Sequence, residues 1–458
     1  MIDLRTHRIS ADMFSDLAEG GGGAAAVDQL AGTQYSKHAL LIRQVVESAC
    51  SAGHKQAAQA RQAYDLLAAV QDHHRNAVDA VLRHPPVGAW ARRTVRMLRD
   101  ARTRGMAVPA QLAAFAVAAA VRSGTDCTAE VPVVDGAVML PSLGRIEVPL
   151  DPPHDQVRIN VVHGRAEAAG DGWSMLVPAD PSADIAGWQG LRRLSASAGG
   201  ARFQVLIEDL DACRMPGSGD VRGRLSQEES DGLETILQGA WELLVSHHPA
   251  LAEEVAATIR VFTPLLPPPR GQVSATSRDT FGSIALSAPS DSCSLAVTMA
   301  HETQHAKLSA LLDVVPILWP DNGVRYFAPW RDDPRPLSGL LQGAYAFLGV
   351  TDFWRRQRRA ADSTAEAIRA HAEFARWRAA VKVVVGTLAA SGRLTRPGDI
   401  FVAGMARTLR SWAAEPVPED AAALAQSAAN EHLARWVRSN GPISASRRME
   451  LAARRLPR

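Results

Sequence analysis

The sequence has few of the features that mark secreted, membrane-spanning or nucleic-acid-binding proteins. Four cysteines occur in 458 residues, far apart and without a C-x-x-C pair, so they form neither a disulfide framework nor a zinc ribbon. No apolar run approaches about 18–20 residues without a charge, so we expect no membrane span. The net charge of +2 gives no general electrostatic case for binding nucleic acid.

The composition is that of an ordinary globular protein. Hydrophobic residues make up 47% and charged residues 21%, and the length is enough for two or three domains with a sizeable core. The opening residues MIDLRTHRISADMF lack a basic segment followed by an apolar one, so we expect no secretory signal. We therefore expect a cytoplasmic protein with reduced thiols.

The spacing of apolar residues divides the chain into three regions and predicts an α+β fold that is mostly α-helical. Residues 1–124 form a helical N-terminal region, in which apolar residues recur every three or four positions. Residues 128–212 form a β-rich region of β-branched runs separated by Gly and Pro turns. Residues 225–458 form a helical domain that carries a metal-binding motif, with later helices expected at 337–361, 363–391, 397–413 and 418–438.

The motif H-E-x-x-H lies at His301, Glu302 and His305, within the apolar stretch 294–315. Residues four apart share one face of a helix, so both imidazoles can reach a single ion, while Glu302 points about 100° away. The motif also arises by chance, and two surface histidines would then have no function. The apolar neighbours predict half-buried histidines instead, and a metal ion is the simplest partner for a buried pair.

The third metal ligand does not follow a peptidase pattern. In the metzincin form a third His follows six residues after the second, and here that position is Leu311. The first downstream glutamate is Glu366, far along the chain, so a zinc peptidase stays open with little support. Gln342 can also face the metal as a tentative ligand, although a hydrogen bond at the edge of the core is the alternative reading.

A loop rich in arginine and aspartate follows the motif. Arg331 and Arg335 flank Asp332 and Asp333 in the segment RYFAPWRDDPRP. Guanidinium groups bind carboxylates through paired hydrogen bonds, so either arginine could hold a dicarboxylate cosubstrate. The alternative is a structural Arg–Asp network that holds the loop.

Several separate motifs carry a resemblance to one known family. They are GQVSATSRDTFGSIALS, TMAHETQHAKLSALLDVV, YFAPWRDDPRPLSGLLQGAYAFLGVTDFWRR, HPPVGAWARRTVRML and RWRAAVKVVVGTLAASGRLTRPGDIFVAGM, in different parts of the chain. The chain resembles an actinobacterial peptide-modification family with an H-E-x-x-H motif. Its members are described as α-ketoglutarate, H-E-x-x-H-type peptide β-hydroxylases of ribosomal peptide clusters, found beside or fused to radical-SAM enzymes.

The resemblance implies an Fe(II) enzyme that hydroxylates a side-chain β-carbon of a ribosomally synthesised precursor peptide. His301 and His305 would ligate the iron, and Arg331 or Arg335 would pair with the distal carboxylate of α-ketoglutarate, which is converted to succinate. Glu302 would be a ligand, an orienting group or a substrate contact, whereas a peptidase would use it as general base.

Two alternatives remain open from the sequence. One is a zinc metallopeptidase that processes such a peptide, because imidazole ligands suit zinc as well as iron. The other is a non-catalytic peptide-binding partner of a radical-SAM enzyme, in which any metal is structural.

Overall fold

The computed structural model describes residues 7–151, 153–269, 271–361 and 363–441. Within these residues the fold is α+β, with 54% helix and 15% strand, so helix predominates as the sequence predicts. Thirteen α-helices and three sheets occur in the described part of the chain. The predicted fold class is therefore confirmed.

The elements follow one another along the chain in an order that alternates helical and β-rich stretches. The helices are α1 (Ala11–Ala18), α2 (Gly23–Ser51), α3 (Ala57–His73), α4 (Arg75–Leu82), α5 (Pro85–Arg99), α6 (Leu112–Ser123), α7 (Gln227–His247), α8 (Pro249–Thr258), α9 (Ser292–Leu312), α10 (Leu337–Gln357), α11 (Thr364–Ala389), α12 (Arg396–Ser411) and α13 (Glu419–Asn440). The strands are β1 (Cys127–Pro132), β2 (Ala137–Leu140), β3 (Gly144–Glu147), β4 (Gln156–Val162), β5 (Arg165–Gly170), β6 (Trp173–Leu176), β7 (Trp188–Gly190), β8 (Arg193–Ala198), β9 (Ala201–Ile207), β10 (Val261–Pro264), β11 (Ser274–Ala275) and β12 (Ser283–Leu286). Two short 3₁₀ turns, at Arg104–Met106 and Pro109–Gln111, precede α6.

A five-stranded mixed sheet positions the helix that carries the motif. Its strand order is β11-β12-β10-β9-β8, with β10 parallel to both β9 and β12, and β8 and β11 antiparallel to their neighbours. The other two sheets, β1-β4-β5-β6 and β2-β3-β7, are antiparallel. The motif helix α9 begins six residues after β12 ends, so the sheet fixes where α9 starts.

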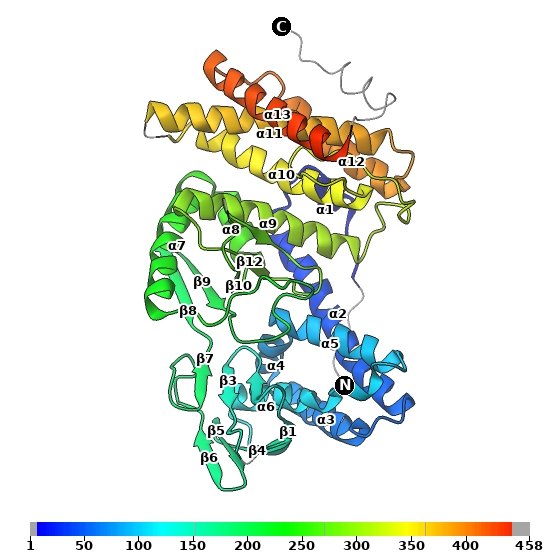
Figure 1. The fold of residues 1–458 in the computed structure, drawn as a ribbon, viewed down its shortest axis with the longest axis vertical. Coiled ribbons are helices and arrows are strands. Elements are labelled where there is room, and N and C mark those ends of the chain that lie inside the picture. The colour runs from blue at the N-terminus through cyan, green and yellow to red at the C-terminus, as the bar shows by residue number, and fades with distance from the viewer. Residues whose placement is uncertain (1–6, 152, 270, 362, 442–458) are drawn as a thin grey trace.

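The buried side chains form two hydrophobic clusters. The first includes α1, the start of α2, strands β8, β9, β10 and β12, and helices α7 to α12. The second includes the rest of α2, helices α3 to α6 and strands from β1 to β7. Helix α2, 29 residues and about 43 Å long, extends from one cluster to the other (Figure 1).

The two clusters divide the chain differently from the three regions read from the sequence. Strands β8 and β9 lie within the predicted β-rich region 128–212, but they belong to the mixed sheet of the first cluster. Residues 14–31, from the predicted helical region 1–124, also pack into that cluster. Alternating hydrophobicity predicts a strand, but it does not show which distant strand will pair with it.

Side-chain caps and a glycine define several helix ends. Ser226 and Glu229 form a reciprocal capping box at the start of α7, which satisfies two backbone N–H groups. Gly124 ends α6 with φ 72°, a left-handed conformation that glycine adopts without a Cβ clash. The four predicted C-terminal helices correspond to α10, α11, α12 and α13, with shifts of up to four residues at their ends.

One apolar stretch, Arg104–Ser123, is long and hydrophobic enough to cross a membrane by composition alone. Of its most apolar window, 67% is buried inside the protein, where α6 packs in the second cluster. A helix in the core of a protein is buried in the same way, so the stretch is weak evidence for a membrane span.

Candidate metal centre

Helix α9 is fixed at its start and along one side. The Asp291 side chain accepts a hydrogen bond from the backbone N–H of Ser294 at 2.8 Å, which caps the helix. Leu295, Met299 and Leu308 are fully buried in the first cluster. The face that carries the motif histidines is therefore held in place by packing on the other faces.

His301 and His305 place their Nε2 atoms 3.2 Å apart. Both side chains are half-buried, as the sequence predicts, and their rings meet edge to face at 4.8 Å. Two nitrogens that bind one ion at about 2.0–2.1 Å lie roughly 3.1–3.4 Å apart when the angle between the bonds is near tetrahedral. The observed separation is also that of a hydrogen bond between the two rings, and it allows both nitrogens to bind one ion.

Gln342 on α10 fixes the orientation of His305. Its Oε1 lies 3.0 Å from Nδ1 of His305, and its Nε2 donates to Oγ of Ser309 at 3.3 Å. With the amide oxygen facing the ring, Nδ1 carries the proton and donates it, so Nε2 of His305 keeps its lone pair toward His301. In this arrangement Gln342 contacts the ring nitrogen that points away from the chelating position.

Burial keeps His301 neutral. Burial and, to a smaller extent, the adjacent His305 lower the pKa of His301 to about 4, while Glu302 acts in the opposite direction. A histidine must be neutral to bind a metal ion. The ring is therefore in its binding form throughout the physiological pH range.

Glu302 faces the edge of the mixed sheet. Its side chain is 1% exposed, and Ser274 Oγ donates to Oε1 at 2.6 Å while Thr276 Oγ1 donates to Oε2. Ser274 belongs to β11, the edge strand of the sheet. Both carboxylate oxygens are thus engaged in attaching α9 to the sheet edge.

Aromatic side chains cover His301 on the side of α10. The ring of Phe347 meets His301 edge to face at 4.9 Å, and Trp330 and Trp377 stack on Phe347 at 4.9 and 4.2 Å. Gly343 makes room for this stack, because a Cβ there would lie 2.4 Å from Nε1 of Trp330. These rings shield one side of the candidate site from water.

Arg331 and Arg335 both pair with Asp333. Their guanidinium groups lie 3.0 and 2.9 Å from its two carboxylate oxygens, and their side chains are 57% and 36% exposed. The loop between α9 and α10 is also held from α13, where Arg435 pairs with Asp332 at 3.1 Å. The Arg–Asp network proposed as the alternative from the sequence is present, and the cosubstrate role of these arginines stays a prediction.

A buried ion pair supports α9 on the side of the N-terminal segment. Lys307 Nζ lies 2.8 Å from Oε2 of Glu254 on α8 and donates to the carbonyl of Gly20 at 3.2 Å. Gln304 donates to the same carbonyl at 2.9 Å. Lys307 is 1% exposed, so it is a structural support of the motif helix and not a surface charge.

Of the residues predicted from the sequence, the structure brings His301, His305 and Gln342 into direct contact. Glu302 is adjacent in sequence but bonds to the sheet edge, and the two arginines bond to Asp333. Sequence reasoning missed Ser274, Thr276 and the aromatic stack. No local pattern marks them, because each reaches the motif from a segment that pairs or packs only in the folded chain.

The side chains that could bind a metal ion at this site are two imidazoles and one amide. In the described ranges, 7–441 without 152, 270 and 362, no group of three or more His, Cys, Asp or Glu residues is arranged to hold a metal ion. Neither a protein-family model nor a curated protein matches the chain. The function is therefore inferred from the chemistry of this site and from the motifs in the sequence.

Proposed function

We propose that this protein is an Fe(II)- and α-ketoglutarate-dependent hydroxylase that acts on a side-chain β-carbon of a ribosomally synthesised precursor peptide. The single observation that carries the proposal is the His301–His305 pair, with Nε2 atoms 3.2 Å apart and one ring oriented by Gln342. The motifs that resemble the peptide β-hydroxylase family supply the substrate class. The donor atoms fit a divalent transition-metal ion, and they suit iron and zinc alike.

When bound, iron with α-ketoglutarate and oxygen supplies the oxidising power needed to hydroxylate an unactivated C–H bond. His301 and His305 would hold the metal through Nε2. Gln342 would orient His305, since a hydrogen bond to Nδ1 fixes the tautomer and ring position of a ligand histidine. This role replaces the tentative assignment of Gln342 as a direct ligand.

The position of Glu302 favours a hydroxylase over a peptidase. A zinc peptidase needs this carboxylate as a general base next to a metal-bound water. Here both oxygens accept hydrogen bonds from hydroxyl groups, and the side chain is buried. Hydrogen abstraction by an oxidant needs no such base, so Glu302 serves as a positioning residue that holds α9 against β11.

The loop that carries Arg331 and Arg335 lies close to the histidine pair. Trp330 immediately precedes Arg331 and reaches His301 through one intervening ring, Phe347. An exposed guanidinium that now pairs with Asp333 could exchange that partner for the distal carboxylate of α-ketoglutarate. The same aromatic side chains would keep water from the reacting C–H bond.

Anaerobic titration with Fe(II) and α-ketoglutarate tests the proposal. We expect a visible charge-transfer band that requires both components and is lost in His301→Ala. Arg331→Gln or Arg335→Gln should raise the concentration of α-ketoglutarate needed for half-saturation, whereas Arg359→Gln, which removes an equally exposed arginine beside Glu415, should not.

Other outcomes would replace the proposal. Tight stoichiometric zinc binding without a response to α-ketoglutarate, and loss of peptide cleavage in Glu302→Gln with metal retained, would establish a peptidase. Unchanged peptide affinity in His301→Ala, with no turnover of α-ketoglutarate by the unaltered protein, would establish a binding module.

A further inference from the structure

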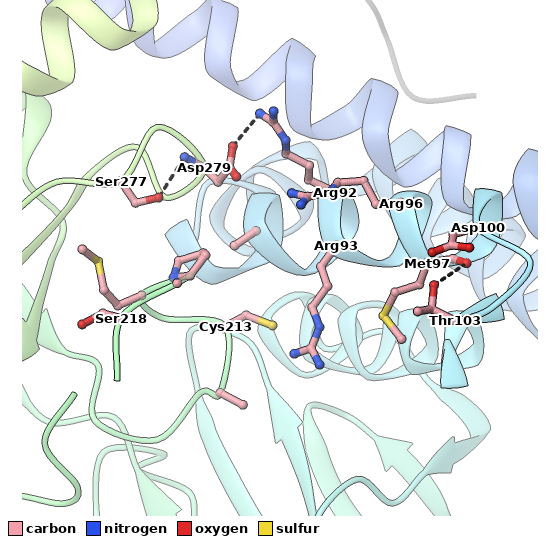
Figure 2. A pocket seen from close by; sticks show the side chains of 15 residues that line it. Arg92, Arg93, Arg96, Met97, Asp100, Thr103, Cys213, Ser218, Ser277 and Asp279 are labelled. Atoms are coloured by element: carbon pink, nitrogen blue, oxygen red, sulfur yellow. Dashed lines mark hydrogen bonds and ion pairs between the residues drawn. The ribbon is translucent and has the colours of Figure 1, made fainter. Parts of the chain in front are cut away.

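A second site lies beside α5, where this helix faces two loops, and Cys213 in one of these loops packs against the second cluster. It is a cavity of about 680 Å³ between α5, the loop 212–218 and the segment 277–279 (Figure 2). Cavities of roughly 300–1,000 Å³ suit ligands larger than a single inorganic ion. Its volume therefore indicates a ligand of several residues or of comparable size.

Three arginines of α5 line this cavity, two of them consecutive and the third about one turn later. Arg92 is paired with Asp279 across the cavity at 2.7 Å, so its charge is balanced. Arg93 and Arg96 are exposed, and within the described residues neither has a carboxylate at ion-pair distance. The guanidinium of Arg93 lies beside Cys213 (Figure 2), and its charge opposes the rise in the pKa of the thiol that burial causes. Two positive charges thus face the cavity without a carboxylate partner.

One further charge in the lining is negative: with Asp100 and Asp279 against the three arginines, the lining has a net charge of +1. Asp100, at the end of the cavity beside Thr103, accepts a hydrogen bond from the backbone N–H of Arg102 at 3.0 Å. The remaining lining includes apolar groups such as Met97, Met215 and Pro216. The cavity combines guanidinium groups with apolar surface, which suits a peptide that carries both carboxylates and aliphatic carbon.

A short segment joins this cavity to the histidine pair. Ser274 and Thr276 donate to Glu302 beside the pair, and Ser277 and Asp279 line the cavity. Residues 274 and 275 belong to β11 and the chain turns at 278–279, so the segment spans less than the about 17 Å of a fully extended chain. A ligand held in the cavity could therefore run along this segment and reach the histidines within a few residues.

We propose that the cavity binds the acidic side chains of an extended peptide through Arg93 and Arg96, and thereby holds the peptide substrate for the histidine pair. This inference rests on the proposed function, because it identifies the ligand as the substrate of that site. Guanidinium groups recognise carboxylates through paired, charge-assisted hydrogen bonds. The occupant is therefore an acidic peptide and not a basic or neutral one.

Fluorescence anisotropy with a labelled hexapeptide of alternating Glu and Ala tests this without any metal. We expect the unaltered protein to bind it more tightly than the matching Lys–Ala peptide. The double variant Arg93→Gln/Arg96→Gln should bind it roughly twofold to thirtyfold more weakly, as expected for two exposed ion pairs. The matched control Arg99→Gln/Arg102→Gln removes the same charge outside the cavity and should change affinity less than twofold.

Three results would overturn the inference. They are equal binding of the two peptides, an equal loss in the two double variants, or full displacement of the Glu–Ala peptide by inorganic phosphate at its own binding concentration. The last result would assign the cavity to small free anions. The charge-transfer titration keeps the two proposals separate. If the Arg93→Gln/Arg96→Gln protein keeps the charge-transfer band but loses peptide binding, both proposals are supported. If the unaltered protein gives no band, only the hydroxylase proposal is refuted.

Discussion

Replacing Gln342 by leucine should weaken metal binding without unfolding the protein. The substitution removes the acceptor 3.0 Å from Nδ1 of His305, so the ring loses the contact that fixes its tautomer. Loss of such an orienting partner costs about 10–100-fold in metal affinity, or about 1.4–2.7 kcal/mol. Because leucine is close in volume to glutamine, the packing of α10 on α9 should survive.

Helix α10 supplies a matched control for this experiment. Gln357 makes the same kind of contact, with Oε1 3.0 Å from Nε2 of His248, at the far end of the helix. Gln357→Leu therefore removes a glutamine–histidine contact that has no part in metal binding. Anaerobic titration with Co(II), followed by its visible absorption, gives the dissociation constant of each variant.

The result can contradict the reasoning in two ways. Equal affinities for the unaltered protein and Gln342→Leu would show that Gln342 does not orient His305 in the metal-bound state. A loss well above a hundredfold, together with a changed Co(II) spectrum, would show that Gln342 is a direct ligand, as the sequence tentatively predicts. An equal loss in Gln357→Leu would assign the effect to general destabilisation.

Three further predictions concern stability and packing. Lys307→Met leaves the buried Glu254 carboxylate without its partner and should lower the free energy of unfolding by about 3–5 kcal/mol, measured by urea denaturation. Gly343→Ala places a Cβ 2.4 Å from the indole of Trp330 and should displace that ring, which near-ultraviolet circular dichroism and tryptophan fluorescence will detect. Burial lowers the pKa of His38 from 6.5 to about 4. Between pH 6.5 and pH 4 the unfolded chain therefore binds a proton at this residue that the folded protein does not bind. The free energy of unfolding should fall by about 3 kcal/mol as the pH is lowered from 6.5 to 4.

Each of these has a variant that separates the named cause from a general effect. Replacing both Lys307 and Glu254 by apolar residues should restore part of the lost stability, because no unpaired charge remains. Gly339→Ala meets only the movable Arg335 side chain, at 3.2 Å, and should leave the tryptophan signals unchanged. In His38→Gln the pH dependence of stability should flatten by one proton between pH 6.5 and 4, and an unchanged slope would refute the assignment.

The sequence alone was sufficient to predict those features that depend on contacts between residues close together in the chain. The histidines share a face because they are four residues apart on a helix, and the capping box at Ser226 forms within one turn. Helix periodicity likewise placed α10 and α11 close to their observed bounds. These features depend on neighbours in the chain, which a single sequence displays.

The rest depends on which distant segments meet. Ser274 reaches Glu302 only because β11 pairs with β12 at the edge of a mixed sheet, and no pattern around Ser274 announces that pairing. Nothing in the sequence around Lys307 indicates a buried ion pair, because its partner, Glu254, lies 53 positions earlier and on another helix. The Arg–Asp–Arg loop could be read either way, since spacing permits both a network and a ligand site.

The attachment of α1 to α12 has a consequence for the order in which the protein forms. Arg407 and Thr408 bond to Glu19, 388 and 389 positions earlier, and Tyr345 donates to the carbonyl of Leu17. Contacts so far apart in sequence close late, because the entropy of a long loop must be overcome before they form. During synthesis the segment before α2 can meet Lys307 and Tyr345 first, but its docking is complete only after residues 396–411 have left the ribosome. The N-terminal segment, which supports the histidine-bearing helix through the Gly20 carbonyl, is therefore among the last parts of the molecule to dock completely.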